Sequence, residues 1–323
     1  MYVSHDQEIL TKIRELNETF MKAVDTARSQ GVGLEEALEL TNGFVEAVMG
    51  ELVDGYGLIP VLGFSGGKDS AVMLHAVYTH LRRLGYEKQL KVLYVEVTGN
   101  THEESVEYVY RFIGKLGVPR ENFVHLRADR DFYELLVRWG FPSPRRRWCM
   151  TVFKRNVVLR FLRELGGNVI VFVGDRLSDS GRRKSLLTRR GVLEYNGYWR
   201  QYTFHPIIHW SLGHVLEYIV RYNLELNPLY TTIGSSGNCV YCPFITDTRY
   251  YQRLKQHYPQ WLEKILDAEK AMRNNGGAIL VSNRVYRLND IVKNGEAGKS
   301  YERLLKYGRR ATFCSIFSCV DLY

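Results

Sequence analysis

The sequence lacks any apolar run approaching the ~18–20 residues that span a bilayer. It therefore predicts a protein without a membrane-spanning helix. The N-terminus, Met1–Asp6, also lacks the basic-then-apolar layout of a secretory signal, so we expect a cytoplasmic protein. Internal repeats and low-complexity segments are absent as well. With these protein classes excluded, we expect an ordinary globular enzyme or binding protein.

Cysteine is scarce, with five residues in a chain of 323. A disulfide framework is not expected in a chain of this size without a secretion signal. Clustered cysteines in such a protein more often bind metal or carry out redox chemistry. The five are Cys149, Cys239, Cys242, Cys314 and Cys319.

Charge of one sign is in excess: 44 Lys and Arg stand against 35 Asp and Glu, a formal net charge of +9. A basic excess favours polyanionic partners, which include nucleotides and strands of RNA or DNA. It is equally compatible with a merely soluble basic surface, because net charge does not report a site.

The chain divides into three regions by pattern. Residues 1–55 show apolar residues at helical spacing and form a helical lead-in, and residues 247–323 begin with a helical stretch (248–274) and end in a basic, tyrosine-rich C-terminal extension. Between them, residues 56–246 alternate short apolar runs with helical stretches. Such alternation predicts an α/β fold with a doubly wound, mainly parallel sheet and helices on both faces. The expected strands are 58–64, 90–97, 123–126 and 169–173, and the expected helices are 34–52, 71–84, 103–116 and 157–165.

A glycine-rich loop lies between the first expected strand and the helix that follows it. Its glycines allow a sharp turn, and successive backbone N–H groups at a helix start form an anion-binding concavity. The spacing differs from G-x-x-x-x-G-K-[ST], because three residues separate Gly63 from Gly67 and Asp69 follows the lysine. The phosphate-binding loop consists of Ser65, Gly66, Gly67, Lys68, Asp69 and Ser70.

This loop resembles the S-G-G-x-D-S loop of the PP-loop ATP pyrophosphatases. Further segments resemble the branch of that superfamily formed by phosphoadenosine phosphosulfate (PAPS) reductases. The similarity covers residues 56–246. The segments that carry it, besides the loop, are the turn 95–101 (V-E-V-T-G-N-T), 147–154 (R-W-C-M-T-V-F-K), 174–183 (G-D-R-L-S-D-S-G-R-R), 205–210 (H-P-I-I-H-W) and 227–230 (N-P-L-Y).

The resemblance implies that the loop grips the pyrophosphate of ATP while attack occurs at the α-phosphate, usually with Mg²⁺. The product is a substrate activated by AMP. Lys68 would be catalytic, and Asp69 would orient the loop or help to hold Mg²⁺. The nucleotide, ATP or PAPS, would also contact Thr98, Gly99 and Gly174, which lie beyond expected strands.

A basic segment follows the last expected strand. Arginines there suit bidentate contacts with phosphate or sulfate. We expect Arg176, Arg182 and Arg183 to lie in a loop and to neutralise an anionic substrate or developing charge, although a charged loop can also be merely solvated.

The Cys-x-x-Cys pair Cys239 and Cys242 can share a metal or cluster or act as a redox pair. The resemblance implies a [4Fe–4S] cluster with Cys149 as third ligand. Trp148 stands where cluster-binding reductases have a second cysteine, so the fourth ligand would be Cys314 or Cys319, or one iron would stay open. A zinc ion, or cysteines that only pack, are the alternatives.

Three functions are compatible with these patterns. The first is ATP-dependent, adenylating sulfur transfer with tRNA or DNA as acceptor, which the intact loop favours. The second is a PAPS or adenosine phosphosulfate reductase that makes sulfite with a thiol and takes electrons from a thioredoxin-like or ferredoxin-like donor. The third is a nucleotide-binding protein without turnover. The oligomeric state is open, since the N-terminal helices could form a dimer contact or a cap on the sheet.

Overall fold

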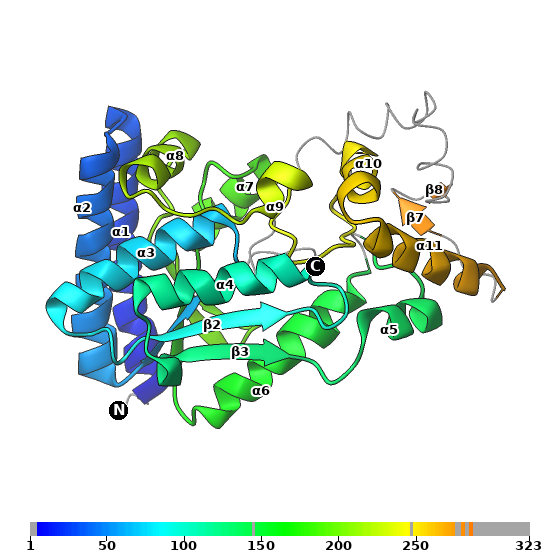
Figure 1. Ribbon diagram of the computed structural model, residues 1–323. Coiled ribbons are helices and arrows are strands. Elements are labelled where there is room, and N and C mark those ends of the chain that lie inside the picture. Colours follow the sequence, from blue (N-terminus) through cyan, green and yellow to red (C-terminus); the bar gives the residue numbers. More distant parts are fainter. Residues whose placement is uncertain (1–4, 144–145, 246–247, 275–278, 282–283, 287–323) are drawn as a thin grey trace.

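A six-stranded sheet forms the centre of the protein, in a computed structural model that describes residues 5–143, 146–245, 248–274, 279–281 and 284–286 (Figure 1). The strand order is β3-β2-β1-β4-β6-β5, and every neighbouring pair is parallel except β5 and β6. The doubly wound, mainly parallel α/β fold is therefore confirmed. The strands are β1 (Ile59–Gly63), β2 (Lys91–Glu96), β3 (Phe123–Arg127), β4 (Val169–Phe172), β5 (Leu193–Asn196) and β6 (Gln201–Phe204).

The strand order reverses at β1. The chain proceeds from β1 through β2 to β3 on one side, and β4 then pairs with the other side of β1, with Val61 opposite Val171. Ligands of open parallel sheets bind beyond the carboxyl ends of the strands at such a reversal. The phosphate-binding loop after β1 and the basic segment after β4 both lie there.

Helices cover both faces of the sheet. Figure 1 shows α3 and α4 on one side of β2 and β3, and α6 on the other. The expected helices are found, most of them within three residues of the expected bounds; α3 begins at Lys68 and so includes the last three loop residues. These helices are α2 (Leu34–Ala47), continued by the π-helical η1 (Val48–Asp54), α3 (Lys68–Leu84), α4 (Glu103–Leu116) and, after the π-helical η3 (Met150–Arg155), α6 (Asn156–Glu164).

The first N-terminal helix caps the edge of the sheet that β5 forms, and the second packs against the first and against α3. Helix α1 (His5–Gln30) is fixed there by Asn17, whose Oδ1 accepts the backbone N–H of Leu193 at 3.0 Å. On α2, the Thr41 hydroxyl accepts the indole N–H of Trp210 at 2.9 Å. Apolar residues of both helices belong to the same buried core as the strands. Of the two roles left open for this region, the structure shows the cap.

Several elements were not expected from the sequence. The β5–β6 hairpin consists of four-residue strands, too short for a clear alternation, and the stretch 248–274 is divided where Pro259 starts a second helix. The additional elements are η2 (Arg120–Asn122), α5 (Phe132–Trp139), α7 (Gly181–Arg190), α8 (Leu212–Arg221), α9 (Leu229–Thr232), β7 (Ile279–Val281) and β8 (Arg284–Tyr286). The helical stretch expected over 248–274 is found as α10 (Thr248–His257) and α11 (Pro259–Asn274).

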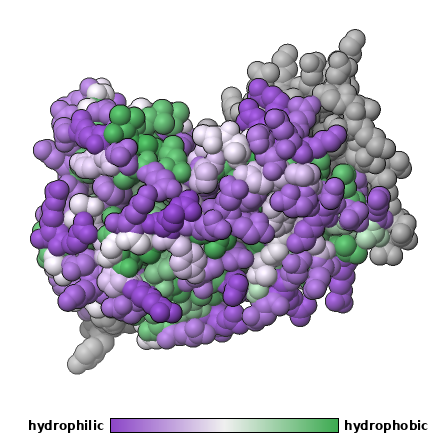
Figure 2. All heavy atoms as spheres, in the orientation of Figure 1, coloured by the Kyte–Doolittle hydropathy of each residue, from purple (hydrophilic) through white to green (hydrophobic). Residues whose placement is uncertain are grey.

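The outer face of α8 is apolar. Leu212, Leu216 and Val220, four residues apart, are exposed by 49%, 49% and 80%, and a hydrophobic patch overlies this helix in Figure 2. In the part of the chain that the structure describes, no helix is both long and apolar enough to cross a membrane.

Candidate functional site

The phosphate-binding loop is a tight, internally bonded turn. Gly66 has φ +74°, in the left-handed region that glycine adopts without strain. The Ser65 hydroxyl accepts the backbone N–H of Gly67 at 3.3 Å and lies 3.0 Å from the Ser70 hydroxyl, which donates to the carbonyl of Gly67 at 2.9 Å. The two serines, both buried, thus shape the loop.

A segment distant in the sequence braces the loop from outside. The Asn227 side chain donates to the Ser236 carbonyl at 2.7 Å and to the Gly66 carbonyl at 3.5 Å. Tyr230, at the start of α9, accepts the backbone N–H of Lys68 at 3.1 Å. Burial raises the pKa of Tyr230, so its hydroxyl stays protonated near neutral pH and can also donate to an anion.

Asp69 lies at the centre of the charged groups around the loop. Its Oδ2 is 2.7 Å from Lys68 Nζ, and its Oδ1 is 2.9 Å from Nη2 of Arg176. The Arg176 side chain is only 4% exposed. Gly174 lets the end of β4 approach this point, since an added Cβ would lie 3.3 Å from the Asp69 carbonyl oxygen. The loop and the segment after β4 therefore form one cluster of charged groups.

The arginines after β4 are ion-paired, which the sequence patterns did not predict. Arg176 Nη2 contacts Asp179 at 2.7 Å, and Arg183 contacts Asp179 at 2.7 Å and Asp175 at 3.5 Å. Burial alone would lower the pKa of Arg183, but these two carboxylates raise it above its ordinary value. Both arginines are thus held in place within the protein, and Asp175 and Asp179 are site residues that sequence reasoning missed.

The position of Arg182 and Arg183 differs from the loop that was expected. Both lie in the first turn of α7, whose N-cap is Ser180; the Ser180 hydroxyl accepts the Arg183 backbone N–H at 3.1 Å. Serine is a common N-cap residue, so Ser180 could have indicated the start of a helix. Gly181 beside it instead favoured the prediction of a loop. Arg182 is exposed on this turn, while Arg183 points to the ion pairs.

The turn after β2 connects the sheet to the cysteine loop. Thr98 donates to the carbonyl of Ala128 at 2.7 Å, and Gly99 has φ +79°. Asn100 is buried, accepts the backbone N–H of Tyr241 at 2.8 Å and donates to its carbonyl at 2.9 Å. Thr98 and Gly99 shape this turn, and Asn100, also missed, fixes the Cys-x-x-Cys segment at the carboxyl edge of the sheet.

Three of the expected metal ligands lie near one another. Burial, then the neighbouring Cys239 and Cys242, raise the pKa of Cys149 to about 12, and burial with Cys239 raises that of Cys242 to about 12. Lys154 opposes both shifts, as it would favour thiolates. The thiol donor set is chemically suited to an iron–sulfur cluster. Within the described part of the chain, however, no three His, Cys, Asp or Glu side chains are arranged to hold a metal ion. Cys314 and Cys319 lie outside the described residues.

A family model of the phosphoadenosine phosphosulfate reductase domain matches residues 59–245, more than half of the chain. Two uncharacterized proteins of Methanocaldococcus jannaschii are similar in sequence. One is 30% identical over 205 residues, covering 63% of this chain and 40% of the relative, and the other is 28% identical over 209 residues, covering 64% and 46%. The chain thus spans less than half the length of these relatives.

Solved structures resemble the fold distantly. A PAPS reductase of Candida auris in complex with phosphate has a TM-score of 0.44 at 15% identity and covers 72% of this chain and 93% of its own. A U34-tRNA thiolase of Methanococcus maripaludis with its [4Fe–4S] cluster has a TM-score of 0.43 at 12% identity and covers 81% and 89%.

Proposed function

The chain belongs to the phosphoadenosine phosphosulfate reductase domain family, and on that premise we propose that it is a PP-loop enzyme that activates its substrate with ATP and replaces the activated oxygen with sulfur. The family match supports a nucleotide-binding enzyme of sulfur chemistry. The observation that carries the finer proposal is the loop itself, in which a lysine, a carboxylate and a turn of glycines stand at the start of α3.

The first step is adenylation. The β- and γ-phosphates of ATP would rest on the loop backbone and the start of α3, with Lys68 moving from Asp69 onto a phosphate oxygen. Asp69 would keep the contact of its Oδ1 with Arg176, and its Oδ2, released by Lys68, would be available to hold Mg²⁺. A carbonyl oxygen of the substrate attacks the α-phosphorus, the bond to the β-phosphate breaks, and pyrophosphate leaves.

The second step is sulfur transfer. A hydrosulfide attacks the carbon that carries the adenylate; the carbon–sulfur bond forms, the carbon–oxygen bond to AMP breaks, and a proton is released. Cys149, Cys239, Cys242 and Cys314 are the ligands we propose for a [4Fe–4S] cluster. With Cys314 unbound, one iron of a cluster held by the other three cysteines would be open and would supply a place for the sulfide. Buried Lys154 would favour the anionic form of Cys149 and Cys242, against the burial that raises their pKa.

A tRNA or DNA strand is the acceptor class that we propose, since the net charge of +9 favours a polyanion. The alternative is reduction of PAPS or adenosine phosphosulfate to sulfite, with electrons from a thioredoxin-like or ferredoxin-like donor. This alternative is favoured by the family match, because the matched domain family is named after PAPS reduction.

One experiment separates the two. The protein is purified anaerobically, iron and acid-labile sulfide are measured, and turnover of ATP and of PAPS is followed on the same sample. We expect AMP and pyrophosphate from ATP when bulk tRNA and sulfide are supplied. Sulfite released from PAPS, with ATP unchanged, would instead identify a reductase.

A further inference from the structure

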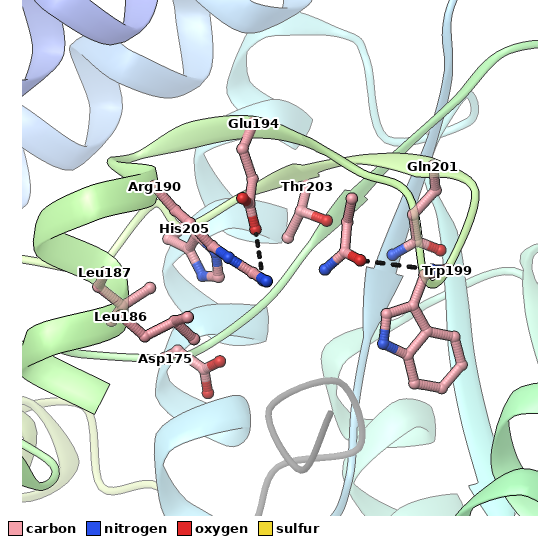
Figure 3. A pocket seen from close by; sticks show the side chains of 10 residues that line it. Asp175, Leu186, Leu187, Arg190, Glu194, Trp199, Gln201, Thr203 and His205 are labelled. Carbon is pink, nitrogen blue, oxygen red and sulfur yellow. Dashed lines mark hydrogen bonds and ion pairs between the residues drawn. The ribbon is translucent and has the colours of Figure 1, made fainter. Parts of the chain in front are cut away.

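A small polar pocket lies between α7 and the β5–β6 hairpin. Gln201, Thr203 and His205 alternate along β6 and its end, so their side chains share one face of the strand. Figure 3 shows them beside Arg190 of α7, which pairs with Glu194 of β5 at 3.1 Å. We refer to this cavity as the polar pocket.

Polar atoms in the polar pocket are buried without hydrogen-bond partners. They are Nε2 and Oε1 of Gln201, Oγ1 of Thr203 and Nδ1 of His205, in residues that are only 2%, 4% and 4% exposed. Buried polar atoms are nearly always bonded to protein or to ordered water, because leaving them unbonded opposes folding. Unbonded polar atoms on three neighbouring side chains indicate that a polar molecule binds between them.

The size of the cavity decides which partner fits. Its volume is about 10 Å³. A cavity of roughly 10–15 Å³ accommodates one water molecule, and a buried water commonly makes two to four hydrogen bonds. The amide, hydroxyl and imidazole of the polar pocket offer that number. A nucleobase or a sugar would not fit the cavity as it stands.

The polar pocket is joined to the phosphate-binding loop by charged contacts. Asp175 lines the pocket and pairs with Arg183 at 3.5 Å. Arg183 pairs with Asp179, which in turn pairs with Arg176, both at 2.7 Å, and Arg176 reaches Asp69 of the loop at 2.9 Å. A change in the orientation of Asp175 would therefore be transmitted through these contacts to Arg176, which holds Asp69.

We propose that the polar pocket binds one ordered water molecule, and that Gln201, Thr203 and His205 are positioning residues that act through this water and Asp175 on the phosphate-binding loop. Burial lowers the pKa of His205 to about 4, although Asp175 opposes the shift, so the ring is neutral near pH 7 and can bond a water without a counter-charge. The inference rests on the proposed function only in treating the loop as the nucleotide site.

The test compares Thr203→Val with Thr203→Ser in the full chain. Valine has nearly the same shape but no hydroxyl, whereas serine keeps the hydroxyl. A high-resolution crystal structure of the wild type is expected to show water within hydrogen-bond distance of Gln201 and Thr203. Binding of a non-hydrolysable ATP analogue, or of PAPS if the wild type prefers it, is measured by calorimetry. We expect Thr203→Val to bind at least fivefold more weakly with an unchanged or higher melting temperature, and Thr203→Ser to bind like the wild type.

Thr188→Val is the matched control, because Thr188 is exposed on α7 and its hydroxyl bonds only to its own helix, at Lys184. A dry pocket in the wild-type density, unchanged affinity in Thr203→Val, or a Thr203→Ser variant as weak as Thr203→Val would overturn the proposal. A wild type that binds nucleotide but forms neither AMP nor pyrophosphate would contradict the proposed function and leave the polar pocket's role intact.

Discussion

The Tyr230 hydroxyl accepts the backbone N–H of Lys68 at 3.1 Å, and so joins two segments 162 residues apart at the start of α3. This N–H is one of those that a phosphate would use at a helix N-terminus. Tyr230 therefore occupies the border of the anion site and orders the loop before nucleotide arrives.

Tyr230→Phe is expected to weaken nucleotide binding about three- to tenfold without unfolding the protein. The reason is the loss of one hydrogen bond that orders the loop and of one donor to phosphate, worth about 1 kcal/mol. Calorimetric titration with an ATP analogue measures it. Tyr222→Phe, at the exposed end of α8, is the control, and equal affinities of both variants would exclude a role for the Tyr230 hydroxyl.

Lys68→Ala is expected to lower ATP turnover by at least roughly 100-fold, because the variant loses the positive charge nearest the leaving pyrophosphate. Release of pyrophosphate is the assay, and circular dichroism checks the fold. Lys22→Ala, on the exposed surface of α1, should keep full activity. Wild-type ATP cleavage by Lys68→Ala would refute the assignment of the loop.

Cys239→Ala is expected to remove most iron and the brown colour from anaerobically purified protein, since a cluster bound by thiolates is lost when a ligand is removed. Iron and sulfide are determined per chain. Ser236→Ala, in the same loop, serves as control. An iron content equal to that of the control would remove Cys239 from the proposed cluster.

Gly99→Ala is expected to destabilise the protein by about 2–4 kcal/mol, from a left-handed φ and the displacement of the Asp131 cap of α5. The added Cβ would fall 1.9 Å from Asp131 Oδ2. Urea unfolding gives the free energy. Gly43→Ala, exposed within α2 with open space around it, should be neutral or stabilising by up to about 1 kcal/mol. Equal stability of the two variants would disprove the steric argument.

Stability should fall as the pH is lowered from 7 to 5. Burial lowers the pKa of His209 to about 4. As the pH falls below about 6.5, this histidine therefore binds a proton in the unfolded chain but not in the folded protein. This contribution is complete above pH 6.5 and is lost toward pH 4. Between pH 7 and 5 it amounts to roughly 2 kcal/mol. In urea titrations, His209→Gln should reduce the fall in the free energy of unfolding over this range by that amount. A slope unchanged by His209→Gln would contradict the assignment.

Most of the fold could be predicted from the sequence because local patterns dictate it. The runs at β1, β2 and β4 are buried on both faces, and such runs read as continuous apolar segments. The hairpin β5–β6 could not be read in the same way. Its face toward α7 carries Gln201, Thr203 and His205, so a buried strand there looks polar in the sequence.

The candidate site divides in the same manner. The sequence by itself determined the loop residues 65–70, because glycine turns and a lysine at a helix start are local chemistry. The proximity of Cys149 to the Cys-x-x-Cys pair followed only from the family resemblance, and the contact of Arg176 with Asp69 only from the structure. Tertiary structure decided which groups are paired: Arg176 and Arg183 are bound by carboxylates, and Tyr230 by the loop itself. Such pairings depend on distances between strand ends that the order of the sheet sets, and no local pattern in the chain encodes that order.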